Sequence, residues 1–157
     1  MSATKAKNEN IIEIKNLKKY YPLTSGLMRK VTGMVKAVDD VSFVIPKGKT
    51  VGLVGESGCG KTTISKCILR AVDPTEGEIY LNNEQGTHDL ANLSDNELRP
   101  LRKEMQMIFQ DPFSSLNPRM NLFDIVSEPL LLNGIKNRTE RQDRVEELLI
   151  KVGLRSE

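Results

Sequence analysis

The residues best suited to chemistry lie in a glycine-rich run at positions 55–63, Gly-Glu-Ser-Gly-Cys-Gly-Lys-Thr-Thr. Its spacing of Gly, four residues and Gly-Lys-Thr is the phosphate-binding P-loop pattern. Glycines allow successive backbone N–H groups to turn inward, and such a cup at a helix N-terminus attracts phosphate oxygens. Lys61 supplies a positive charge for the β- and γ-phosphates, and the Thr62 hydroxyl is suited to Mg²⁺. The residues predicted to bind are Glu56, Ser57, Gly58, Cys59, Gly60, Lys61, Thr62 and Thr63.

The segments on either side of the glycine run decide how it is interpreted. Residues 50–54 are predicted to form a short buried strand, and Ile64, Ile68 and Val72 recur with helical spacing. Strand, glycine loop and helix form the setting that phosphate binding requires. A tight turn that binds no ligand is the alternative interpretation.

Other elements are predicted from alternation, turn residues and caps. Residues 22–36 contain Pro22 and two glycines and are expected to be a loop or a hairpin excursion. Ser94 and Glu97 form a capping-box pattern that begins a short helix, with a break expected at Pro100. Further strands are predicted at residues 11–17, 38–45, 78–81 and 105–109, and further helices at 122–129 and 137–153.

Composition limits the class of protein. The chain has 157 residues, of which 38% are hydrophobic and 28% charged, as is ordinary for one soluble globular domain. No apolar run approaches the ~18 residues of a membrane span, and the polar first ten residues lack the apolar core of a secretory signal. Cys59 and Cys67 fit neither a disulfide framework nor a zinc site, which favours a reducing cytosol.

Charge is unevenly distributed along the chain, although the formal net charge is only +2. Residues 1–36 hold eight basic and two acidic side chains, which leaves 15 basic against 19 acidic in the remainder. A basic leader could contact a membrane surface or nucleic acid. Its charges are scattered, which favours a solvated chain end instead.

Together these motifs resemble the ATP-binding subunits of ABC transporters, most closely the group that imports oligopeptides and dipeptides. The resemblance rests on the glycine run, on residues 36–43 and 74–79, and most specifically on residues 107–120, Met-Ile-Phe-Gln-Asp-Pro-Phe-Ser-Ser-Leu-Asn-Pro-Arg-Met. It implies an α/β fold, a P-loop NTPase core with a mixed sheet followed by the start of a helical subdomain. The implied division is a disordered tail at 1–10, the N-terminal part of the nucleotide-binding core at 11–110, and the Q-loop exit with the start of the helical subdomain at 111–157.

The resemblance also implies roles for individual residues, with ATP and Mg²⁺ as cofactors. Tyr21 corresponds to the aromatic residue that stacks on adenine, with Tyr20 as the alternative. Val38 is implied to contact the nucleoside or to be a core strand residue. Gln110 corresponds to the Q-loop glutamine, which reaches Mg²⁺ or the attacking water. Lys61 and Gln110 are thus the implied catalytic residues, and Thr62 and Gln110 the implied metal ligands.

The implied partners follow from the same family. Two ATPase subunits, identical or different, enclose two ATP molecules and dock onto transmembrane permease subunits, while a substrate-binding protein acts indirectly. The expected location is peripheral, at the cytoplasmic face of the cell membrane. Nucleic acid is not an expected partner.

The sequence departs from the family pattern in its second half. It contains no Leu-Ser-Gly-Gly-Gln signature and no apolar run ending in Asp-Glu, and its one histidine, His88, is predicted to be a solvated loop residue. The chain is therefore expected to be the N-terminal portion of a longer ATPase, and to bind ATP without turnover. The alternatives are a nickel importer ATPase of the same group, a non-transport ABC ATPase that acts on nucleic acid, and a catalytically silent docking module.

Overall fold

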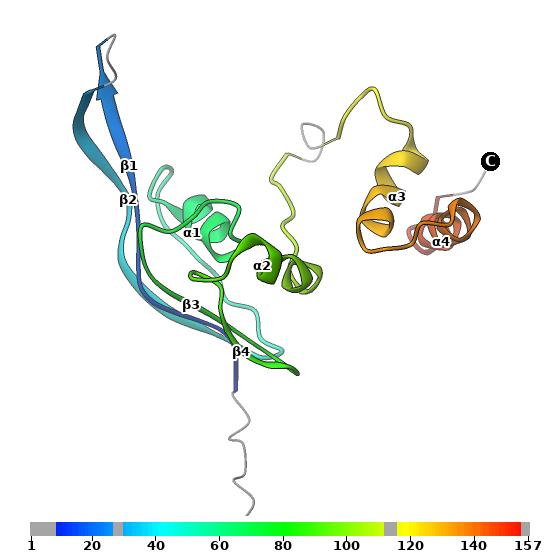
Figure 1. The fold of residues 1–157 in the computed structure, drawn as a ribbon, viewed down its shortest axis with the longest axis horizontal. Coiled ribbons are helices and arrows are strands. Elements are labelled where there is room, and N and C mark those ends of the chain that lie inside the picture. The colour runs from blue at the N-terminus through cyan, green and yellow to red at the C-terminus, as the bar shows by residue number, and fades with distance from the viewer. Residues whose placement is uncertain (1–8, 27–29, 112–115, 155–157) are drawn as a thin grey trace, which may run out of the picture. The chain divides into compact units, whose positions relative to one another are not determined.

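The computed structural model describes residues 9–26, 30–111 and 116–154. The chain divides into two compact units, residues 1–106 and residues 107–157, and each is described by itself. The first unit is built on an antiparallel sheet in the order β2-β1-β3-β4 (Figure 1). The strands are β1 (Asn10–Ser25), β2 (Lys30–Pro46), β3 (Glu76–Asn83) and β4 (Gly86–Asp89).

The core of the first unit lies between this sheet and two short helices. Helix α1 (Lys61–Ile68) contributes Ile64 and Cys67, and α2 (Asp95–Leu101) contributes Leu98 and Leu101. Burial removes Cys67 from water, which disfavours the thiolate and raises the pKa of its thiol. The strands contribute alternate residues, as expected for a sheet with one buried face. The strand residues in this core are Ile12, Ile14, Leu17, Val38, Ile79 and Leu81.

The pairing of β1 with β2 is irregular near the middle of both strands. Asn16 and Asp40 adopt left-handed φ angles of 48° and 58°, which Asn and Asp tolerate better than other residues with a side chain. The Asn16 side chain donates a hydrogen bond to Asp40 at 2.8 Å, and the Asn16 backbone N–H donates to Ser42 at 2.8 Å. These side-chain bonds replace ladder bonds where the register shifts between Ile14 and Leu17.

For residues 22–36 the structure bears out the expected hairpin and corrects the alternative of a loop, because paired strands occupy most of that segment. Strand β1 continues through Pro22 to Ser25, and β2 begins at Lys30. The last pair between β1 and β3 joins Lys18 to Glu76, so beyond Lys18 one edge of β1 has no partner among the described strands. Proline is tolerated at such an edge because no ladder hydrogen bond is lost.

A second correction concerns residues 50–54 and 105–109, predicted as buried strands. Neither segment forms a strand, and the side chains of Val54 and Ile108 are each 91% exposed. A strand needs a neighbour for its backbone N–H and C=O groups, and neither segment has one within the described ranges. The strands described are therefore all antiparallel, whereas a mixed sheet was expected.

Local signals placed the other elements of the first unit well, with one omission. The capping box at Ser94 and Glu97 begins α2, and the 3₁₀ helix η1 (Arg102–Glu104) follows directly after Pro100 and Leu101, close to the expected break. The polar segment after Leu81 was expected to be a loop. It instead forms the β3–β4 hairpin, with Asn82 paired to Thr87.

The second unit contains α3 (Leu122–Leu132) and α4 (Arg138–Lys151). The Asn121 side chain accepts a hydrogen bond from the Asp124 N–H and caps α3, which continues past Pro129, where the sequence predicted its end. Asn137 caps α4 as predicted. None of the helices in the described ranges has the length and apolar character needed to cross a membrane.

Candidate functional site

The glycine run joins β2 to α1, and its last glycine touches the strand. Gly60 is the N-cap of α1 and has a left-handed φ of 94°. A Cβ atom on Gly60 would lie 2.2 Å from the backbone oxygen of Ala37 in β2. Only glycine satisfies both constraints, so this residue brings the start of α1 against the strand that carries Val38.

Lys61 is held over the loop by the loop's own backbone. Its Nζ donates hydrogen bonds to the carbonyl oxygens of Gly55 at 2.8 Å and Glu56 at 2.6 Å, and lies 3.4 Å from Cys59 Sγ. An ammonium group has three donors, and the thiol is a weak acceptor. The ammonium group is thus fixed in position, with its third donor engaged only weakly.

The first turn of α1 also carries two hydroxyl groups, those of Thr62 and Thr63. Thr62 is exposed and Thr63 half-buried, and the Thr62 hydroxyl makes no hydrogen bond to the described part of the chain. A hydroxyl without a protein partner in the first turn of α1 suits Mg²⁺ bound to phosphates, because Mg²⁺ keeps several waters and takes few protein ligands. No group of three His, Cys, Asp or Glu side chains in the described ranges is arranged to hold a metal ion.

The two tyrosines of β1 lie on opposite faces of the β1–β2 ribbon, because neighbouring residues of a strand alternate. Tyr21 is 39% exposed and pairs with Val35, and the Nζ of Lys19 lies 4.9 Å from its ring centroid. Lys19 pairs with Val38, whose side chain packs near Gly60. Tyr21 therefore shares the face that the glycine run occupies.

Tyr20 lies on the other face of the ribbon, where its hydroxyl group is hydrogen-bonded. Its hydroxyl donates a hydrogen bond to Asp39, which also accepts one from the Lys36 ammonium group at 3.1 Å. Both donors stabilise the ionised carboxylate and lower the pKa of Asp39. The hydrogen bond from Tyr20 to Asp39 also favours the protonated hydroxyl, which raises the pKa of Tyr20. Sequence reasoning missed this cluster, although the alternation of Tyr20 and Tyr21 along a strand was the signal that could have indicated it.

Two further predicted site residues, Val38 and Gln110, and the predicted surface residue His88 have different surroundings. Val38 is 3% exposed, which places it in the core and leaves little surface for a nucleoside. Gln110 is exposed and belongs to the second unit, so its role stays a prediction. His88 was predicted to be solvated; it is half-buried in β4, with Nε2 3.1 Å from Asn83 Oδ1.

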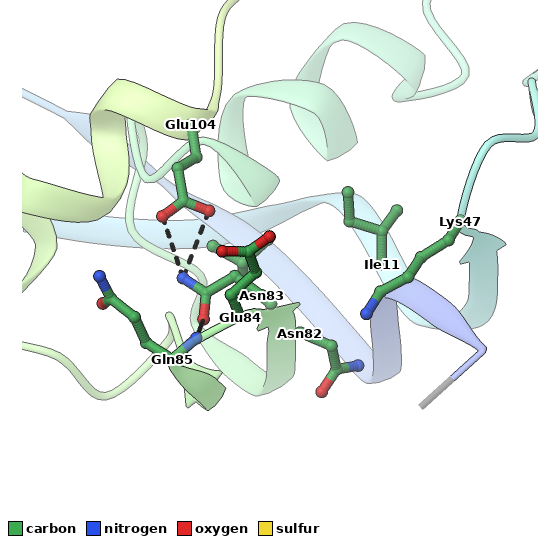
Figure 2. Close-up of a pocket in the computed structure, with 8 residues that line it drawn as sticks. Ile11, Lys47, Asn82, Asn83, Glu84, Gln85 and Glu104 are labelled. Atoms are coloured by element: carbon green, nitrogen blue, oxygen red, sulfur yellow. Dashed lines mark hydrogen bonds between the residues drawn. The ribbon is translucent and has the colours of Figure 1, made fainter. Parts of the chain in front are cut away.

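A hollow of about 460 Å³ lies at the β3–β4 hairpin and contains none of the predicted site residues (Figure 2). Asn83 closes one side, because its amide donates to both carboxylate oxygens of Glu104 at 3.0 and 3.3 Å and accepts from the Gln85 N–H. The lining residues are Ile11, Lys47, Leu81, Asn82, Asn83, Glu84, Gln85 and Glu104. The hollow is therefore separate from the glycine run.

Comparison with known proteins gives one consistent family. Residues 38–157 match the family model described as ABC transporter. The oligopeptide transport ATP-binding protein AppF of Bacillus subtilis is 49% identical over 152 residues, which cover 96% of this chain and 45% of AppF. The dipeptide transport ATP-binding protein DppF of Haemophilus influenzae is 43% identical over 151 residues, which cover 96% of this chain and 44% of DppF.

Solved structures show the same likeness in the fold. The dimeric structure of a post-hydrolysis state of the ATP-binding cassette MJ0796, bound to ADP and Pi, superposes with a TM-score of 0.71 at 28% identity. The match covers 92% of this chain and 58% of that one. The chain spans about half the length of the curated relatives it matches.

Proposed function

Because the chain belongs to the ABC transporter family, we propose that it is part of the ATP-binding subunit of an importer for oligopeptides or dipeptides. In this proposal, binding and hydrolysis of ATP drive uptake by the complete protein. The observation that carries nucleotide binding is the Lys61 ammonium group, fixed by the carbonyls of Gly55 and Glu56. The cargo class is supported by AppF and DppF, which are named for oligopeptide and dipeptide transport.

The glycine run would hold the phosphates through backbone N–H groups and the positive end of the α1 dipole. Lys61 would place its ammonium group beside the β- and γ-phosphates and neutralise charge there. The Thr62 hydroxyl would hold Mg²⁺. When bound, Mg²⁺ neutralises phosphate charge as the terminal phosphoryl group passes to water.

Tyr21 is the proposed stacking partner for the adenine ring. Its ring is exposed on the face that carries Val38 and the glycine run. The Tyr20 ring is held on the other face by Asp39. Lys19, 4.9 Å from the Tyr21 ring, would support the orientation of that ring from its own strand.

The proposed partners are a second ATPase subunit and transmembrane permease subunits, reached at the cytoplasmic face of the membrane, with a substrate-binding protein acting indirectly. The second subunit is supported by the dimeric state named for MJ0796. Permease docking is supported by the apolar side chains that the second unit exposes on its helices. Those exposed side chains include Leu131, Leu132, Ile150 and Val152.

Titration of the purified chain with a fluorescent ATP analogue in the presence of Mg²⁺ tests the phosphate cradle. We expect Lys61→Ala to weaken binding by at least about tenfold, because a charge-assisted hydrogen bond to phosphate is lost. Lys66→Ala, a change of the same type on α1, is the matched control and should bind as the unchanged chain does. Equal binding by the Lys61→Ala variant and the unchanged chain would refute the proposal.

A phosphate-release assay on the same samples tests the absence of turnover. The sequence has no apolar run ending in Asp-Glu to provide a general base, so we expect at most one phosphate released per chain. Repeated turnover by the 157-residue chain would contradict this expectation.

A further inference from the structure

The β1–β2 ribbon extends beyond the rest of the sheet, and the proposed function gives a role only to Tyr21 and Lys19, at the inner end of this extension. We call residues 19–25 and 30–37 the arm. Strand β3 pairs with β1 only as far as Lys18, so among the described strands the arm consists of β1 and β2 alone. Figure 1 shows β1 and β2 continuing together past β3 and β4. An isolated two-stranded ribbon is marginally stable in water, so this feature calls for a partner.

Apolar side chains are exposed on both faces of the arm. Leu23, Val31 and Met34 are each more than half exposed. Leu23 pairs with Gly33, and the next pair along the ribbon joins Pro22 to Met34, so Leu23 and Met34 point to opposite faces. A protein partner would cover one face, whereas a medium that surrounds the end of the arm would meet both.

The arm is also basic, and part of its charge is unpaired. Residues 19–25 and 30–37 include Lys19, Lys30 and Lys36 and no Asp or Glu. Lys36 is paired with Asp39 at 3.1 Å. Lys19 and Lys30 form no ion pair with any residue that the structure describes, and Lys30 lies next to Val31 at the outer end of β2. The complementary partner is therefore negatively charged.

We propose that the arm binds the surface of an anionic lipid bilayer. Leu23, Val31 and Met34 enter the boundary between headgroups and acyl chains, and Lys30 pairs with lipid phosphates there. The unpaired backbone groups at the ribbon edges stay at headgroup depth, where water and phosphate satisfy them. This contact needs no nucleotide, so its failure would leave the proposed function intact, and failure of nucleotide binding would leave the contact intact.

Co-sedimentation of the 157-residue chain with vesicles, without nucleotide, tests the proposal. One set of vesicles is phosphatidylcholine alone, and the other contains about one quarter phosphatidylglycerol. We expect binding to the anionic vesicles only, with loss at high salt because the attraction between charges is screened. Lys30→Glu should weaken binding on the order of tenfold, since it reverses a charge near the lipid surface.

Matched variants distinguish binding through the arm from nonspecific binding of the chain to vesicles. Lys103→Glu makes the same charge change on the exposed η1 and should bind as the unchanged chain does. The triple change of Leu23, Val31 and Met34 to Ser should abolish binding, whereas Ile150→Ser with Val152→Ser on similarly exposed positions should not. Circular dichroism shows whether the triple variant folds. If it does not fold, the vesicle binding of Lys30→Glu, a change that breaks no ion pair in the described structure, tests the proposal by itself.

Three results would overturn the proposal: equal binding to neutral and anionic vesicles, equal losses in arm and control variants, or a self-associated chain that the arm variants dissociate. The last result would assign the arm to a second copy of this chain. Binding to oligonucleotides that competes with vesicles and is lost in Lys30→Glu would assign it to nucleic acid.

Discussion

At the scale of single residues, a comparison of two glycines in the phosphate loop distinguishes the cost of a left-handed backbone from the cost of a steric clash. Gly58 and Gly60 both have left-handed φ angles, 81° and 94°. A Cβ atom at Gly58 meets nothing within 4 Å, whereas one at Gly60 lies 2.2 Å from the backbone oxygen of Ala37. The difference between alanine substitutions at these positions therefore measures the contact between the loop and β2.

We predict that Gly60→Ala destabilises the first unit clearly more than Gly58→Ala. Each substitution forces a side chain into the left-handed region, at about 1–2 kcal/mol. Gly60→Ala must in addition displace the β2 backbone near Ala37, and weakening of nucleotide binding should accompany this shift. Urea unfolding followed by circular dichroism measures the two free energies of unfolding. Equal values would show that α1 and β2 do not press together at Gly60.

The sequence alone predicts a phosphate loop because the motif is local, and the predicted roles of Lys61 and Thr62 rest only on their spacing. It could not supply the Ala37 contact or the hydrogen bond from Tyr20 to Asp39. Both depend on the pairing of β1 with β2, and a register shift between Lys19 and Tyr20 sets that pairing. Residues far apart in sequence decide such shifts, so no local pattern reveals them.

At the scale of elements, the helix starts marked by capping residues and the strands at residues 11–17, 38–45 and 78–81 were predicted. The full extent of the strands, and which apolar segments have a neighbour to pair with, were predicted less well. The caps Ser94 and Asn137 begin helices where expected, and Gly153 follows α4 with a φ of 79°. Residues 50–54 have strand-like composition but no neighbouring strand, while residues 22–36 lack it and pair nevertheless. A helix satisfies its own backbone, whereas a strand depends on what lies beside it.

The capping box of α2 gives a prediction for pH. The Ser94 hydroxyl and backbone N–H donate to Glu97 Oε2 at 2.6 and 2.9 Å and lower the pKa of Glu97 from its usual 4.5. The contribution is present above about pH 4.5 and is lost as the pH falls through the lowered pKa of the folded state. Ser94→Ala should cost about 1 kcal/mol at neutral pH, and the cost should shrink in acid.

Urea unfolding at neutral pH and at about pH 3 measures this change. Ser94→Thr is the control, because threonine keeps the hydroxyl and also caps helices. A cost of Ser94→Ala that stays the same at both pH values would show that Glu97 adds nothing to the cap.

At the scale of the whole molecule, each unit exposes an apolar segment whose backbone N–H and C=O groups form no strand pairing within the described ranges. In the first unit Val51, Leu53 and Val54 are exposed, and in the second Ile108 and Phe109 are exposed. These segments form no ladder within the described ranges, so their backbone groups and side chains are both available. Extended apolar segments with unpaired edges are templates for pairing between chains.

We therefore predict that the 157-residue chain self-associates as its concentration rises, and that these two segments are responsible. A charge placed in each should interrupt pairing, so Val54→Lys with Ile108→Lys should weaken association by at least about tenfold. The control is Leu132→Lys with Val152→Lys, at apolar positions in or beside helices that are also well over half exposed. Because helical backbone groups are already paired, these side chains do not template a strand, and the control should associate as the unchanged chain does. Size-exclusion chromatography with light scattering over a concentration series compares the unchanged chain, the segment variant and the control variant. An unchanged chain that stays monomeric and melts cooperatively would contradict the prediction.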